Sequence, residues 1–260
     1  MKYINCKAIA QEILDEVKSV DTPKGLLIIA VGHNPASESY IKGKVKDCEY
    51  CGIPCHIARP TTQDALYETI MTANMDKSIG GIIVQLPLPE GWDEDYYTAL
   101  VSRDKDVDGF RTDSAFAPCT PEGIMHILHK EIGDLTGRGV LVIGRGKLVG
   151  EPIVKMLVNE DCTVTIAHSK TLGLSHYVRE AEIVISATGR FGLVDLLDCE
   201  DALVVIDAGV TRNNEGKLVG DCYNFTEDYY NLKVTPVPGG VGLLTRAMLM
   251  KHMMEVNKII

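Results

Sequence analysis

Three polar side chains in the first half of the chain have the types and positions that acid–base chemistry needs. Lys44 lies four residues after Tyr40, so the two share one face of the helix expected there. Gln85 stands at the end of an apolar run, and Asp108 lies in a polar, turn-rich stretch. A partly buried lysine amine can transfer a proton near neutral pH. Each residue also has a structural explanation, as a surface lysine, a strand-end amide or a turn-forming aspartate.

A glycine-rich turn in the second half could bind phosphate. The apolar run 140–143 leads into Gly144, and Gly146 and Gly150 follow before a helix-like run begins. This pattern predicts a buried strand, a tight turn and a helix N-terminus, whose N–H groups and dipole suit a pyrophosphate. The spacing is one residue longer than the usual dinucleotide fingerprint, so a turn without a ligand is the alternative.

The residues that follow the next expected strand favour NADP over NAD. An NAD site of this fold needs a carboxylate about twenty residues after the glycine turn. His168, Ser169 and Lys170 stand there instead, and Arg145 lies inside the turn itself. These groups would attract the additional phosphate of NADP, which a carboxylate would repel. An ordinary solvated loop is the alternative for 168–170.

Strands that alternate with helices must position these residues. Such alternation predicts parallel βαβ units, hence an α/β fold with two domains, the second of Rossmann type. Thr120 and Pro121 are expected to cap and begin the helix that crosses into the second domain. The final helix could return to the first domain. Strands are expected over 25–31, 53–58, 81–86, 140–143, 163–166, 182–186 and 203–207, and helices over 8–17, 37–51, 64–74, from 121, 149–158 and 241–256.

Composition and charge narrow the classes of partner. The chain has 260 residues, 45% of them hydrophobic, and a formal net charge of −10. That charge argues against a nucleic-acid partner, which needs a basic face. We find no signal-peptide pattern and no apolar run long enough to span a membrane, so a cytoplasmic protein without membrane contacts is expected.

The eight cysteines are expected to be reduced thiols, since a chain of this length needs no disulfide framework. Cys48, Cys51, Cys55 and His56 resemble a string of metal ligands. However, Cys48 and Cys51 have helical spacing, whereas Cys55 falls in the following strand, and no second group of such residues appears. We therefore expect no metal site.

Taken together, these stretches resemble the bifunctional methylenetetrahydrofolate dehydrogenase/methenyltetrahydrofolate cyclohydrolase family over nearly the whole chain. Several matching strings in the right order make the resemblance specific. They are 31–44 (VGHNPASESYIKGK), 81–89 (GIIVQLPLP), 104–110 (DKDVDGF), 118–121 (PCTP), the Gly144 turn, 168–171 (HSKT) and 234–242 (VTPVPGGVG).

The resemblance implies a two-domain enzyme with a cleft between its domains. A folate-binding catalytic domain would comprise 1–119 and 241–260, and a Rossmann-type NADP-binding domain 120–240. The enzyme would oxidise 5,10-methylenetetrahydrofolate with NADP and hydrolyse the methenyl product to 10-formyltetrahydrofolate. The family also implies a homodimer.

The resemblance further implies a role for each candidate residue. Lys44 would transfer protons during hydrolysis, Gln85 would contact that lysine, Tyr40 would stack on the folate, and Asp108 would hold its pterin ring. Leu86, Pro238, Gly239 and Gly240 would complete the folate site. The cofactor site would comprise Gly144, Arg145, Gly146, Gly150, His168, Ser169, Thr188 and Val210.

Two stretches depart from the family pattern. Gly146 stands where the family has serine, and Leu243-Leu244-Thr245 replaces Pro-Met-Thr. The missing hydroxyl could loosen cofactor binding, so a dehydrogenase with weak hydrolysis or with a preference for NAD is an alternative. A folate-binding protein without catalysis is a further one.

Overall fold

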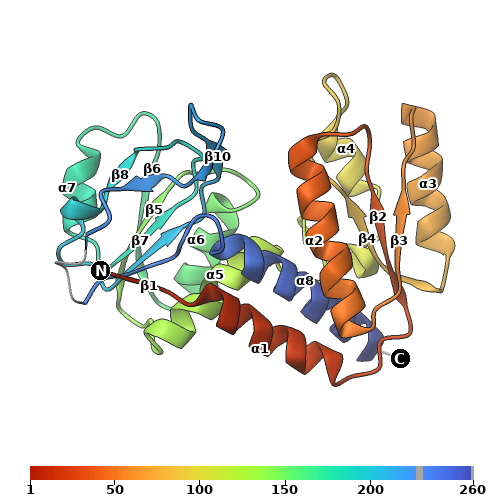
Figure 1. Ribbon diagram of the computed structural model, residues 1–260, viewed down its shortest axis with the longest axis horizontal. Helices are drawn as coiled ribbons and strands as arrows, with labels where there is room; N and C mark the ends of the chain where they lie inside the picture. Colours follow the sequence, from red (N-terminus) through yellow and green to blue (C-terminus); the bar gives the residue numbers. More distant parts are fainter. Residues whose placement is uncertain (227–230, 259–260) are drawn as a thin grey trace. The chain divides into compact units, whose positions relative to one another are not determined.

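The computed structural model describes residues 1–226 and 231–258, which fall into two compact units. The three-stranded unit comprises Gln11–Cys119 and Arg246–Ile260, and the six-stranded unit comprises Met1–Ala10 and Thr120–Thr245. Figure 1 labels most of the helices and many of the strands of both. Two helices, α1 (Cys6–Lys18) and α8 (Val241–Lys258), begin in the six-stranded unit and end in the three-stranded one.

The three-stranded unit is built on a parallel sheet of order β3-β2-β4. Its central strand, β2, is buried at every residue, as its uninterrupted apolar sequence requires. Leu27 and Ile29 of β2 pack with Ile82 of β4 and with Leu66 and Ile70 of α3. The elements are β2 (Gly25–Ile29), α2 (Pro35–Cys51), β3 (Cys55–Ala58), α3 (Gln63–Met75), β4 (Ile79–Val84), α4 (Glu94–Ala99) and η1 (Arg103–Lys105).

The six-stranded unit has a parallel sheet of order β1-β13-β9-β7-β5-β6. β6 lies on one side of β5, and β7 lies on the other, so the strand order reverses at β5. The elements are β1 (Lys2–Tyr3), α5 (Cys119–Glu131), β5 (Gly139–Ile143), α6 (Gly150–Asn159), β6 (Thr163–Ala167), α7 (Leu174–Arg179), β7 (Ile183–Ser186), β8 (Val194–Asp195), η2 (Leu196–Asp198), β9 (Val204–Asp207), β10 (Thr211–Arg212), β11 (Leu218–Val219), β12 (Cys222–Tyr223) and β13 (Lys233–Val234).

The α/β fold with a parallel, Rossmann-type second sheet is confirmed, and each long strand and helix lies near its expected position. Three details differ. The first ten residues were expected in the folate domain, but β1 pairs with β13 and joins the six-stranded unit. Helix α5 begins at Cys119, so Thr120 lies inside its first turn, where its hydroxyl bonds to that of Thr245 at 2.9 Å. β4 begins and ends two residues earlier than expected, which leaves Gln85 just beyond it.

Short elements were missed because they carry no readable periodicity: the six-residue helices α4 and α7 and the two-residue strands. No helix in the described ranges is both long and apolar enough to cross a membrane. None of the eight cysteines, all of them in the described ranges, forms a disulfide, and the described part of the chain contains no group of three His, Cys, Asp or Glu side chains able to hold a metal ion.

Candidate active site

The amine of Lys44 lies at the centre of the polar cluster in the three-stranded unit. Its side chain projects from α2 and is only 7% exposed. Lys44 Nζ lies 3.2 Å from Gln85 Oε1, a hydrogen bond, and 3.8 Å from Asp108 Oδ2, an ion pair beyond hydrogen-bonding range. The three side chains proposed from the sequence are therefore neighbours. An ammonium group has three donors, so this arrangement can hold the amine and still present it to a substrate.

Hydrogen bonds hold both the backbone and the side chain of Gln85. Its backbone N–H donates to Ile29 O at 2.8 Å, which continues the β2–β4 ladder by one residue. Its side-chain Nε2 donates to Leu86 O at 2.9 Å, so Oε1 is turned toward Lys44. Leu86 thus contributes its carbonyl to the site, and the Leu86–Pro87 peptide bond is cis.

Asp108 is positioned by a tight turn. The buried carboxylate of Asp106 closes this turn, because it accepts hydrogen bonds from the N–H groups of Phe110 at 3.3 Å and Arg111 at 2.9 Å. Gly109 has φ +71°, and a Cβ there would lie 2.4 Å from Ala117 O, so only glycine fits. Burial raises the pKa of Asp106. Asp106 was not among the residues predicted from the sequence, although its place two residues before Asp108 could have suggested it.

A second ion pair lies beside Lys44 on the same helix. Arg246 Nε of α8 is 3.1 Å from Asp47 Oδ2, and both side chains are largely buried. The guanidinium lies directly against the backbone of Gly43. A Cβ at Gly43 would therefore clash with Arg246 Nη1. Burial raises the pKa of the Asp47 carboxyl, and Arg246 partly offsets that effect. Gly43, Asp47 and Arg246 thus join α2 to α8 immediately beside the candidate proton-transfer group.

Tyr40 lies one turn before Lys44 on α2, and the residue is 40% exposed. An accessible aromatic face of this kind can stack on a planar ligand. Ser37, nearer the start of α2, donates to Leu86 O at 3.4 Å and so links the helix to the loop after β4.

The glycine turn follows β5, as predicted. Gly144 has φ +108° and donates its N–H to Ala167 O at 2.9 Å. A Cβ at Gly150 would lie only 2.3 Å from Gly144 O, so the two glycines allow helix α6 to begin directly against the turn. Arg145 and Gly146 between them are exposed. The tight approach and the exposed guanidinium together form a cradle that fits a dinucleotide pyrophosphate.

Four strands of the six-stranded sheet end level with one another. Ile143 of β5 is in register with Ala167 of β6 and Ser186 of β7, and Ser186 with Asp207 of β9. The reversal of strand order at β5 marks this edge as the ligand-binding one. The cofactor residues proposed from the sequence follow these strand ends directly: Gly144, His168, Ser169, Thr188 and Val210.

The turn after β6 is closed by its own hydrogen bonds. His168 N donates to Thr171 Oγ1 at 2.9 Å, and Thr171 N donates to His168 O at 2.8 Å. Lys170 N donates to His168 Nδ1 at 3.2 Å. The turn therefore offers hydroxyl, imidazole and ammonium groups where an NAD site would have a carboxylate.

Asp221, which sequence analysis missed, holds the loop after β7. It is fully buried, and its Oδ2 accepts hydrogen bonds from Ser186 Oγ at 2.6 Å and from both N and Oγ1 of Thr188 at 2.8 Å. Its Oδ1 accepts from Arg190 N at 2.7 Å. A Cβ at Gly209 would lie 2.0 Å from Asp221 Oδ1, so the loop after β9 also closes against this carboxylate.

Asp207 plays the corresponding part at the end of β9. Its Oδ1 accepts from the N–H groups of Gly209 at 3.1 Å and Asp221 at 3.0 Å, and its Oδ2 accepts from Cys222 N at 2.9 Å. Burial raises the pKa of Asp207. In the sequence, Asp207 is recognisable only as a polar residue at the end of an apolar run. The sequence does not show which N–H groups its carboxylate meets.

Pro238, Gly239 and Gly240 lie between β13 and α8 within the six-stranded unit. Gly239 has φ +96°, and a Cβ at Gly240 would lie 2.2 Å from Pro236 O. The Val237–Pro238 bond is cis. The chain thus turns tightly just before α8, with Pro238 and Gly239 exposed and Gly240 buried.

Comparisons with known proteins agree with this arrangement. Residues 4–108 match the catalytic domain of tetrahydrofolate dehydrogenase/cyclohydrolase, and residues 118–259 match the NAD(P)-binding domain of the same enzymes. The bifunctional protein FolD of Agathobacter rectalis is 39% identical over 274 residues, which cover 98% of each chain.

Solved structures show the same similarity. The bifunctional dehydrogenase/cyclohydrolase FolD from Campylobacter jejuni superposes with a TM-score of 0.92 at 37% identity, covering 98% of both chains. FolD from Trypanosoma brucei, solved with NADP and an inhibitor, superposes with a TM-score of 0.90 at 30% identity, covering 99% of this chain and 97% of that one. The fold and site define a folate-processing, dinucleotide-dependent enzyme. The chain belongs to the tetrahydrofolate dehydrogenase/cyclohydrolase family.

Proposed function

We propose that the two units divide one metabolic conversion between them. The enzyme oxidises 5,10-methylenetetrahydrofolate with NADP and hydrolyses the 5,10-methenyl product to 10-formyltetrahydrofolate. We assign folate binding and hydrolysis to the three-stranded unit and cofactor binding to the six-stranded unit. The observation that best supports the first assignment is the buried Lys44 amine, 3.2 Å from Gln85 Oε1 and 3.8 Å from Asp108 Oδ2.

Oxidation requires little acid–base catalysis from the protein. A nitrogen lone pair of the substrate expels the hydride from the methylene carbon, and NADP, when bound, accepts it. The contribution of the protein is to orient the rings. We assign the pyrophosphate to the backbone of the Gly144–Gly150 turn, the additional phosphate to Arg145, His168 and Ser169, and further cofactor contacts to Thr188 and Val210.

Hydrolysis is where Lys44 acts. A water molecule adds to the methenyl carbon while Lys44, as the neutral amine, takes one of its protons. Lys44 then returns that proton to the ring nitrogen as the carbon–nitrogen bond breaks, and the second water proton leaves to solvent. The formyl group stays on the other nitrogen. Gln85 holds the amine in place, because its own amide is anchored to Leu86 O.

The remaining folate contacts are assigned on the same basis. Tyr40 presents an exposed ring on which the folate stacks, and the Asp108 carboxylate accepts hydrogen bonds from the pterin. We assign Leu86 and the backbone of Pro238, Gly239 and Gly240 to the same substrate.

A spectrophotometric assay tests the proposal. With methylenetetrahydrofolate and NADP, the purified chain should form NADPH, and the methenyl absorbance should rise and then decay. The Arg145→Ala variant should lose kcat/KM with NADP by about tenfold, the size of a single charge-assisted contact, while its kcat/KM with NAD changes little. Equal losses with both nucleotides would contradict the role of Arg145.

A second candidate is a dehydrogenase with weak hydrolysis or with a preference for NAD. Gly146 motivates it, since the exposed turn has no side-chain hydroxyl at that position. A higher kcat/KM with NAD than with NADP, or methenyl absorbance that persists in the unaltered protein, would favour this candidate.

We also propose a homodimer in the cytoplasm without nucleic-acid or membrane partners. The family resemblance supports the dimer, and a net charge of −10 disfavours binding to a phosphate backbone. Light scattering coupled to size-exclusion chromatography should give twice the chain mass, and a monomer mass would contradict the proposal.

A further inference from the structure

A pocket in the three-stranded unit lies at the opposite sheet edge from Lys44. Its volume is about 630 Å³, and Gly80 and Ile79 of β4 form part of its wall. Gly80 is at the start of β4, whereas Gln85 follows its end. Gly80 and Gln85 are five residues apart, which is about 16 Å along the strand. The pocket is therefore distinct from the candidate active site.

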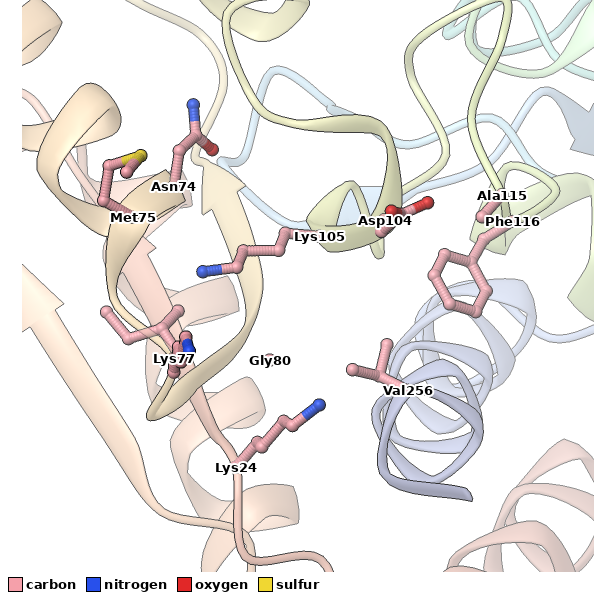
Figure 2. A pocket seen from close by; sticks show the side chains of 11 residues that line it. Lys24, Asn74, Met75, Lys77, Gly80, Asp104, Lys105, Ala115, Phe116 and Val256 are labelled. Carbon is pink, nitrogen blue, oxygen red and sulfur yellow. The ribbon is translucent and has the colours of Figure 1, made fainter. Parts of the chain in front are cut away.

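Its lining combines apolar surface with several amines. Phe116 and Val256 are buried apolar side chains, and Met75 and Ala115 add to the apolar wall at the surface. Three lysines also line it: Lys24, Lys77 and Lys105. Figure 2 shows Lys24 and Phe116 extending toward the same open space. A pocket of this volume with apolar walls and a few convergent polar groups is typical of small-molecule sites.

Lys105 is a fixed part of the wall. Its Nζ donates to Ala73 O at 2.8 Å and to Asp76 O at 2.6 Å at the end of α3. Burial lowers the pKa of this amine, the Asp76 carboxylate partly offsets that effect, and the nearby charge of Lys24 lowers the pKa further. These like charges repel each other across the pocket, and an anion between them would relieve that repulsion.

Lys24 and Lys77 supply positive charges that are not held in ion pairs with described residues. Within the described residues, no carboxylate comes within ion-pair distance of either amine. The backbone of Lys24 is anchored, since its N–H donates to Asn257 Oδ1 at 2.9 Å. One carboxylate, that of Asp104, also lines the pocket. Figure 2 shows it on the side of Ala115, away from the amines of Lys24 and Lys105.

We propose that this pocket is a binding site for an organic anion, a flat apolar body that carries a carboxylate or phosphate group. The apolar body lies against Phe116 and Val256, and the anionic group lies among the lysine amines. A clustering of three lysines is selective for anions in a chain whose net charge is −10, because the rest of the surface repels them.

Calorimetric titration with 1-naphthyl phosphate tests the site, with saturating NADP present to occupy the dinucleotide site. The unaltered chain should bind one equivalent. Neutral 1-naphthalenemethanol and inorganic phosphate should each bind at least tenfold more weakly, because each lacks half of the recognised chemistry. Comparison with 1-naphthoate shows which anionic group is preferred: tighter naphthoate binding assigns a carboxylate, and tighter naphthyl phosphate binding assigns a phosphate.

Variants locate the binding. The double variant Lys24→Ala/Lys77→Ala and the pocket-filling variant Ala115→Phe should each weaken binding at least tenfold. Asp104→Asn should strengthen it about twofold by removing the opposing charge. Lys7→Ala, at an exposed lysine of the other unit, should leave it unchanged. Binding that is equal in the unaltered chain, the double variant and Ala115→Phe would overturn the proposal, as would the absence of binding by the unaltered chain at millimolar probe.

Discussion

In our proposal the three-stranded unit acts through side chains, whereas the six-stranded unit acts largely through the backbone of turns. The Lys44 amine is held between Gln85 and Asp108 and acts directly on the substrate in our proposal. Around the Gly144 turn, by contrast, buried carboxylates face inward and hold loop N–H groups. Substitutions in the first region should therefore change rates, and substitutions in the second should change affinities.

The largest expected effect in the cofactor region comes from Gly144→Ala. The φ of +108° and the approach of Ala187 O to 2.6 Å from a new Cβ would distort the turn. A strain of about 1–3 kcal/mol, placed on the binding conformation, raises the Kd for NADP by up to about 100-fold. Fluorescence titration measures the Kd. The control is Gly146→Ala, because a Cβ at Gly146 meets nothing within 4 Å. Similar Kd values for the two variants would contradict the account of the turn.

A smaller effect is expected from Asp221→Asn. The amide retains one acceptor but turns an NH₂ group toward backbone donors, which costs about 1–3 kcal/mol. The loop that carries Thr188 should loosen, and KM for NADP should rise about tenfold while kcat at saturating NADP stays within about twofold. Steady-state kinetics separates the two parameters. Asp198→Asn, which breaks a surface ion pair with Arg179, should change neither. A fall in kcat with unchanged KM would show that Asp221 does not act through cofactor binding.

The smallest effect is expected from Gly146→Ser, which supplies the hydroxyl that the family carries at this position. The site is open, so the side chain fits. A new hydrogen bond contributes about 0.5–1.5 kcal/mol, which lowers the Kd for NADP by roughly three- to tenfold. Titration beside Gly146→Ala separates the hydroxyl from the added Cβ. Weaker NADP binding by the serine variant would mean that this chain binds the phosphates differently.

The two regions also differ in how far the sequence predicts them. Lys44 and Gln85 were identifiable as polar residues on a helix face and at a strand end, and Asp108 as a polar residue in a turn-rich stretch, while the family resemblance supplied their roles. The glycine turn was identifiable from its spacing. Both signals are local along the chain.

Asp221 was not identifiable in this way. It lies 35 residues after Ser186, and no periodicity indicates which loop N–H groups a buried carboxylate will meet. The same holds for Asp47 and Arg246, which are joined only by the packing of α2 against α8. The position of residues 1–10 was missed for a related reason, since a two-residue strand gives no sequence signal for its partner.

The central claim is that Lys44 transfers the protons in hydrolysis, whereas oxidation depends only on how the substrate and the cofactor are placed. The direct measurement is the methenyl absorbance after Lys44→Met is mixed with methylenetetrahydrofolate and NADP. We predict that the absorbance rises together with NADPH and then persists, because loss of the proton-transfer group slows hydrolysis by about 10²–10⁴-fold. The control variant Lys42→Met, at an exposed lysine of the same helix, should show the rise and decay of the unaltered chain. Decay at the unaltered rate in Lys44→Met would contradict the claim.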